Sequence, residues 1–67
     1  MKMPELPRSE YERIISEWIH SERDRAIVRR KYLDGITFEV LAEEYNLSVT
    51  QTKRIVYNGR DVILKHI

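Results

Sequence analysis

The sequence predicts an all-α domain of four helices, with a helix-turn-helix in its C-terminal half and a long last helix. Apolar residues recur at helical spacing along most of the chain. Only two glycines and two prolines occur among the 67 residues, which leaves little room for long loops. Two helical segments also meet at a short turn near residue 47. We therefore expect one small domain over residues 9–67, which would bury only about 60% of its unfolded surface.

An extended N-terminal arm is predicted for residues 1–8, which hold both prolines, Pro4 and Pro7. Basic arms sometimes enter a DNA minor groove. This arm carries two basic residues and one acidic residue, so we favour the simpler interpretation of a frayed terminus. The arm lacks the apolar stretch of a secretory signal. The chain also has no cysteine, which fits a reducing compartment, and we expect a cytoplasmic location.

The first helix is predicted to begin at Ser9, with Glu12 as its capping partner. Its apolar face consists of Tyr11, Ile14, Ile15, Trp18 and Ile19. We expect this helix to pack across the domain, with Trp18 as an anchor of the core. A protein interface is the alternative, because Trp and Tyr are favoured at interfaces.

The second helix is predicted over residues 22–33, between a capping pair formed by Ser21 and Asp24 and a stop at Gly35. Positive charge concentrates in this region, since residues 23–35 carry five basic and two acidic side chains. The arginines on its polar face either contact phosphates or pair with glutamates of the third helix, and we prefer the pairing. These arginines are Arg25 and Arg29.

The third helix is predicted over residues 38–45, with Thr37 as its N-cap. Ala42 supplies the small side chain that a close crossing with the next helix requires. The turn that follows has Asn46, which tolerates the left-handed conformation common at helix ends. Leu47 is the apolar residue expected to fill the corner of this turn.

The fourth helix is predicted to begin after Ser48, which forms a capping pair with Gln51. The inner face is expected to hold Thr52, Ile55 and Val56. The outer face is expected to hold Thr50, Lys53, Arg54 and Tyr57. Asn58-Gly59 is either a C-terminal cap or part of one long helix with Gly59 at a close crossing. The apolar periodicity continues past residue 59 and favours the long helix, whose apolar end needs the first helix or another subunit as its partner.

An outer face with Thr, Gln, Lys, Arg and Tyr suits the DNA major groove, and a short turn presents that face rigidly. The predicted DNA-binding residues are Thr37, Ser48, Val49, Thr50, Gln51, Lys53, Arg54 and Tyr57. In this interpretation, the free N–H groups behind Thr37 would hold a phosphate. The alternative is an ordinary helical hairpin in a small bundle.

Several short motifs follow one another through about two thirds of the chain. In order, they are an arginine-rich helix ending in Tyr32-Leu33, then Asp34-Gly35, Thr37-Phe38-Glu39, Leu41-Ala42-Glu43-Glu44, Leu47-Ser48 and Thr52-Lys53-Arg54. This series resembles region four of bacterial RNA polymerase sigma factors, the domain that reads the promoter −35 element. The chain departs from that family at Asn46, where glycine is usual, and at Thr52, where an apolar residue is usual. Nothing in it corresponds to the domain that melts the promoter.

The resemblance implies a long recognition helix and sequence-specific binding to double-stranded DNA as a transcription regulator. RNA polymerase would be a second partner, and a homodimer is a further arrangement. The alternative function is a protein-interaction module that binds RNA polymerase or another regulator without strong DNA binding of its own. A net charge of only +1 favours this alternative.

Other classes of function lack support in the sequence. The two histidines, His20 and His66, are far apart in the chain, and no glycine-rich phosphate loop occurs. We therefore expect no enzymatic role, no cofactor and no metal site. No run of about 20 apolar residues is present, so we expect no membrane partner.

Overall fold

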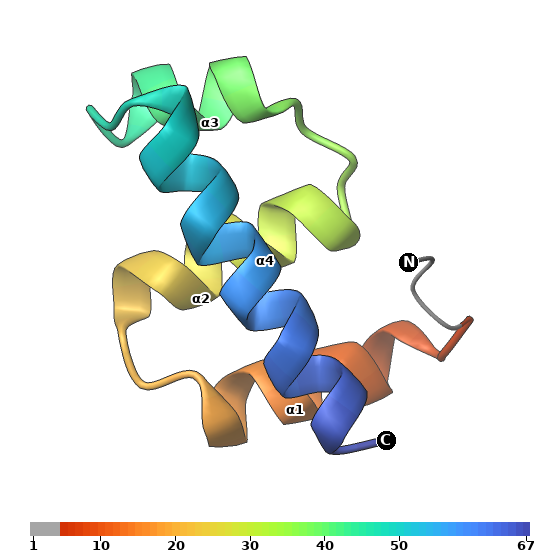
Figure 1. Ribbon diagram of the computed structural model, residues 1–67. Coiled ribbons are helices and arrows are strands. Elements are labelled where there is room, and N and C mark those ends of the chain that lie inside the picture. Colours follow the sequence, from red (N-terminus) through yellow and green to blue (C-terminus); the bar gives the residue numbers. More distant parts are fainter. Residues whose placement is uncertain (1–4) are drawn as a thin grey trace.

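The computed structural model describes residues 5–67 and has four α-helices in that range (Figure 1). They are α1 (Arg8–Trp18), α2 (Glu22–Tyr32), α3 (Phe38–Glu44) and α4 (Val49–Lys65). This arrangement confirms the all-α prediction. The long α4 runs through the molecule, with α3 packed near its beginning, α2 crossing its middle and α1 packed near its end (Figure 1).

Two apolar clusters fill the space around α4. The first cluster joins α1, α2 and the end of α4, and its buried members are Tyr11, Ile14, Ile15, Ile19, Val28 and Ile63. The second cluster joins α2, α3 and the first half of α4, and its buried members are Ile27, Leu41 and Val56. Each fully buried aliphatic side chain stabilises the fold by about 1.5–3 kcal/mol. Half-buried Tyr32 and Ile55 pack against both clusters, so the two form a continuous core.

The start of α1 differs from the prediction. The helix begins at Arg8, one residue early, and Pro7 occupies the N-cap position without a side-chain cap. Ser9 is therefore inside the helix, and its predicted capping role is wrong. Proline suits the site because its φ of −57° is set by its ring and its carbonyl can accept the first helical bonds. Of the predicted arm over residues 1–8, residues 1–4 lie outside the described part of the chain.

Trp18 is not the core anchor that the sequence suggested. The other four residues of the predicted apolar face of α1 are buried, whereas Trp18 is 45% exposed. Ile19, the C-cap of α1, takes the inward position instead. The Trp18 indole stacks on the imidazole of His66 at the end of α4, with 3.9 Å between the ring centroids and 4° between the planes.

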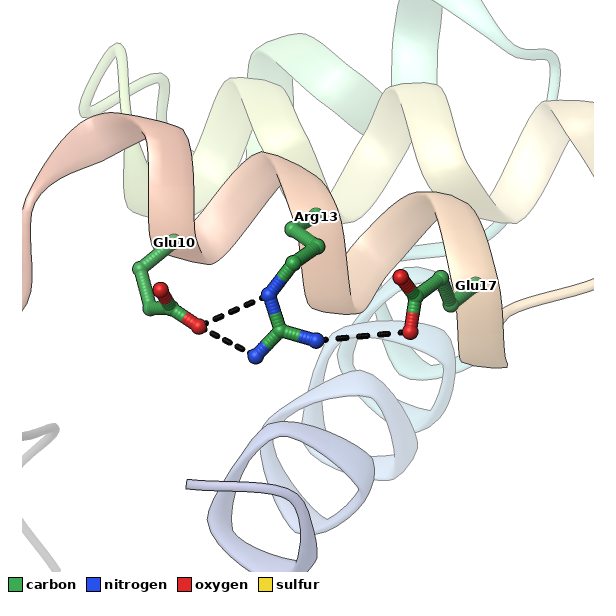
Figure 2. Close-up of polar contacts among 3 residues, drawn as sticks. All are labelled: Glu10, Arg13 and Glu17. Carbon is green, nitrogen blue, oxygen red and sulfur yellow. Dashed lines mark hydrogen bonds and ion pairs between the residues drawn. The ribbon is translucent and has the colours of Figure 1, made fainter.

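The outer face of α1 carries a small ion-pair network (Figure 2). The Arg13 Nε lies 2.8 Å from Glu10 Oε1, and its Nη1 lies 3.3 Å from Glu17 Oε2. The hydrogen bonding to Glu10 raises the pKa of Arg13 above its ordinary value. All three side chains are well exposed, so this network adds little to the stability of the domain.

The predicted limits of α2 are nearly correct. The Asp24 amide donates to the Ser21 hydroxyl oxygen at 3.3 Å, which confirms the N-cap. The helix ends at Tyr32, and Gly35 follows with φ of +70°, which favours glycine. Ile36 then packs against the second cluster.

Arg25 and Arg29 do not pair with glutamates of the third helix, so the pairing that we predicted is wrong. Arg25 donates to backbone carbonyls after α1, and Arg29 pairs with Glu12 of α1 at 3.3 Å. It is Arg30 that pairs with the third helix, through a bidentate contact with the Glu44 carboxylate. This contact raises the pKa of Arg30 and lowers the pKa of Glu44.

The choice between a cap and a long helix at Gly59 is settled in favour of the long helix. α4 continues without a break to Lys65, and Gly59 is buried in it. A Cβ atom at position 59 would lie 2.5 Å from Val28 Cγ2, so glycine allows α2 and α4 to cross closely.

Candidate nucleic-acid interface

The turn between α3 and α4 ends the first helix of the motif with a pair of backbone hydrogen bonds. Asn46 has φ of +56°, as its position after the helix requires. The Leu47 amide donates to the Ala42 carbonyl at 2.8 Å, and the Asn46 amide donates to the Glu43 carbonyl at 3.3 Å. These are the two bonds of a Schellman motif. Leu47 packs on the second cluster, so the turn is held both by backbone hydrogen bonds and by apolar packing.

Both helices of the motif begin with the predicted caps. The Val40 amide donates to Thr37 Oγ1 at 3.3 Å. The Gln51 amide donates to Ser48 Oγ, while Gln51 Oε1 accepts from the Ser48 amide, both at 3.0 Å. This capping box uses the Gln51 carbonyl oxygen but leaves its NH₂ group, two hydrogen-bond donors, toward solvent.

The two faces of α4 lie as predicted. Thr52 is fully buried, and its hydroxyl donates to the Ser48 carbonyl at 2.9 Å. Val56 is fully buried and Ile55 half-buried. The outer face is exposed along the first half of the helix, at Thr50, Gln51, Lys53, Arg54 and Tyr57. Val49, also a predicted site residue, is half-buried at the helix start.

Most cationic side chains of the described residues already have a carboxylate partner. Those in ion pairs are Arg8, Arg13, Arg23, Arg29, Arg30 and Arg60. Within residues 5–67, no ion pair is formed by Lys31, Lys53, Arg54 or Lys65. Lys53 and Arg54 are adjacent on the outer face of α4, whose first turn has no acidic residue. The exposed half of this helix therefore presents positive charge that the domain does not neutralise.

An aromatic pair lies beside these cations. The Lys31 Nζ lies 4.3 Å from the centroid of the Phe38 ring, and the Lys53 Nζ lies 5.6 Å from the same centroid. Tyr57 meets this ring edge-on at 5.9 Å, and the Arg60 guanidinium lies 5.0 Å from the Tyr57 ring. Sequence reasoning missed Lys31 and Phe38, because they come from α2 and α3 and meet α4 only through the tertiary fold.

A separate cavity of about 190 Å³ lies between the end of α1, the start of α2 and the middle of α4. Its walls include Trp18, His20, Asp24, Ile55 and Val62. None of the predicted DNA-binding residues lines it.

Residues 5–67 contain no group of three or more His, Cys, Asp or Glu side chains placed to hold a metal ion. In the same range, no helix is both long enough and apolar enough to cross a membrane. Comparison with protein-family models, curated proteins and solved structures finds no match for this chain.

Proposed function

We propose that this protein binds double-stranded DNA in a sequence-specific manner through α4 and regulates transcription, in the way expected of a stand-alone domain similar to sigma region four. The observation that carries the proposal is the outer face of the first half of α4. It is exposed, it bears Lys53 and Arg54 without ion pairs among the described residues, and it follows a tightly fixed turn. A helix presented in this way fits the major groove.

The residues of this face have distinct roles in the proposal. Arg54 donates two hydrogen bonds to the edge of a guanine, a contact that suits its planar guanidinium. Thr50 contacts a base or a phosphate close to it, and the free NH₂ group of Gln51 donates to a base edge. Lys53 adds positive charge, and Tyr57 flanks the contact at the far end.

The fixed position of α4 supports the same proposal. A recognition helix must enter the groove at one angle, and the close crossing of Gly59 with Val28 packs α4 against α2. The Schellman turn after α3 holds the N-terminal end of α4 in place. Little conformational freedom would then be lost when DNA binds.

Fluorescence anisotropy with a pool of random labelled duplexes, at two salt concentrations, tests the proposal. The wild-type protein should bind, with affinity that falls as salt rises. The variant Lys53→Glu/Arg54→Glu should abolish binding. The variant Arg23→Glu/Lys65→Glu makes the same change in net charge at exposed positions away from the outer face of α4, and it should retain most of the affinity. Equal losses in both variants, or no binding by the wild type, would reject the proposal.

A second candidate function is a protein-interaction module, and a specific observation favours it. Trp18 is 45% exposed and lines the cavity between α1, α2 and α4, and Ile67 is 56% exposed. Exposed aromatic side chains beside a cavity are typical of protein interfaces. In this case RNA polymerase would be retained by the Lys53→Glu/Arg54→Glu variant in a pull-down, and lost by Trp18→Ala.

A further inference from the structure

Two lysines from different helices share one aromatic ring on the surface next to the exposed face of α4. Lys31 belongs to the last turn of α2, and Lys53 to the second turn of α4. Their ammonium nitrogens lie 4.3 Å and 5.6 Å from the centroid of Phe38, so they are within about 10 Å of each other. That separation does not exceed the Debye length of about 10 Å at 0.1 M salt, so salt screens the repulsion between the two charges only in part.

The domain does not supply a carboxylate for either lysine. Within residues 5–67, neither forms an ion pair, although six arginines do. The partial negative charge at the C-terminus of α2 stabilises the ammonium group of Lys31, which lies in the last turn of that helix. The negative face of the Phe38 ring orients both ammonium groups but compensates their charge only in part.

We propose that Lys31 and Lys53 together bind the phosphate backbone of duplex DNA beside the groove that α4 enters. The inference rests on the proposed function and names a contact of the same surface, with Lys31 as a binding residue and Phe38 as a positioning residue. The lysine ammonium is a compact point charge, which suits a phosphate better than the patterned edge of a base. The pair therefore supplies affinity and register, and leaves sequence discrimination to Arg54.

The supporting geometry spans three helices. Lys31 reaches the ring from α2, Phe38 is the first residue of α3, and Lys53 comes from α4. Phosphates bound by these two lysines would therefore fix the docking of the whole motif, and not only of the recognition helix. Backbone contacts of this kind set the orientation of a protein on DNA without reading its sequence.

Salt-dependent anisotropy on single-lysine variants tests the inference, with the random-sequence duplex pool as probe. Lys31→Gln and Lys53→Gln should each weaken binding to all sequences and reduce the slope of log K against log salt by about 0.9, the value for one lost phosphate contact. Lys31→Arg keeps the charge and should keep the slope. Lys65→Gln is the control, because Lys65 is exposed and, like Lys31 and Lys53, lacks an ion pair among the described residues, but lies at the other end of α4.

The outcomes separate this inference from the proposed function. If the wild type binds duplexes but Lys31→Gln leaves the slope at the value of Lys65→Gln, the phosphate contact is wrong and DNA binding stands. If Lys31→Gln alters which sequences are selected from the pool, Lys31 contacts a base, and the inference is also wrong. If the wild type binds no duplex, the proposed function itself fails. Circular dichroism of each variant verifies that a loss of affinity does not come from unfolding.

Discussion

Val28 of α2 and Gly59 of α4 touch at the point where the two helices cross. A Cβ atom on Gly59 would lie 2.5 Å from Val28 Cγ2 and 3.0 Å from Cγ1. The Val28 Cβ would be 3.3 Å away, so most of the overlap is with the two methyl groups of the valine. Val28 is fully buried and has no room to retreat. Glycine thus permits the close crossing of α2 and α4.

Gly59→Ala should therefore destabilise the domain. Alanine favours a helix over glycine by about 1 kcal/mol, but overpacking typically costs about 1–3 kcal/mol. We expect a net loss of stability in urea unfolding. The double variant Val28→Ala/Gly59→Ala removes both valine methyl groups from the overlap, so the added cost of Gly59→Ala should be smaller in the Val28→Ala background. Additive losses in the double-mutant cycle would show that the two residues do not clash.

The capping box at the start of α4 should matter for stability. Ser48→Ala removes the acceptor for the Gln51 amide, and loss of such an N-cap costs about 0.5–2 kcal/mol. Thr50→Ala is a control on the same turn, because Thr50 is exposed and takes no part in the cap. Chemical unfolding of both variants checks this expectation. Equal midpoints for the two would mean that the cap contributes nothing.

The contact between Arg30 and Glu44 should make stability depend on pH. The folded protein has a Glu44 pKa below the ordinary value of 4.5, because the carboxylate is bonded to Arg30. The contact therefore stabilises the fold above that pH, and its contribution is lost as the pH falls through the lowered pKa. Thermal unfolding of Glu44→Gln should show a lower Tm than wild type at neutral pH and a smaller further decrease in acid.

Glu39→Gln is the control for this pH dependence. Glu39 is exposed on the same helix and forms no ion pair among the described residues. Its substitution should leave the acid profile of the wild type unchanged. If Glu39→Gln and Glu44→Gln flatten the profile equally, the bridge between α2 and α3 is not the cause.

Arg54→Ala should relax the sequence preference at one base position and cost about 1–3 kcal/mol of binding free energy. The reason is the loss of a bidentate contact that discriminates guanine from other bases. Selection from a random pool, followed by sequencing, would reveal the position that has become degenerate. A uniform loss of affinity for all sequences would instead make Arg54 a phosphate contact.

Local signals account for the part of the fold that could be predicted. The caps at Ser21, Thr37 and Ser48 follow from short-range hydrogen bonds, and the sequence spacing is enough to recognise them. Gly59 was placed correctly at a helix crossing because the apolar period continues across it. The predicted cap at Ser9 failed because the helix begins one residue earlier, after Pro7.

Side-chain placement that depends on distant partners could not be predicted in the same way. Trp18 and Ile19 are adjacent apolar residues, and only the packing against other helices decides that Ile19 is buried. The pairing of Arg29 with α1 instead of α3 likewise depends on how the helices are arranged. Lys31 and Phe38 meet Lys53 from other helices, so no local pattern marks them as part of one surface.

The central claim is that the exposed half of α4 meets DNA, and NMR titration of the ¹⁵N-labelled protein with duplex DNA tests it most directly. We expect the largest amide shifts at residues 48–57, with smaller shifts at Lys31 and Phe38. Shifts centred on Trp18 and Ile67, or no shifts at all, would contradict the claim.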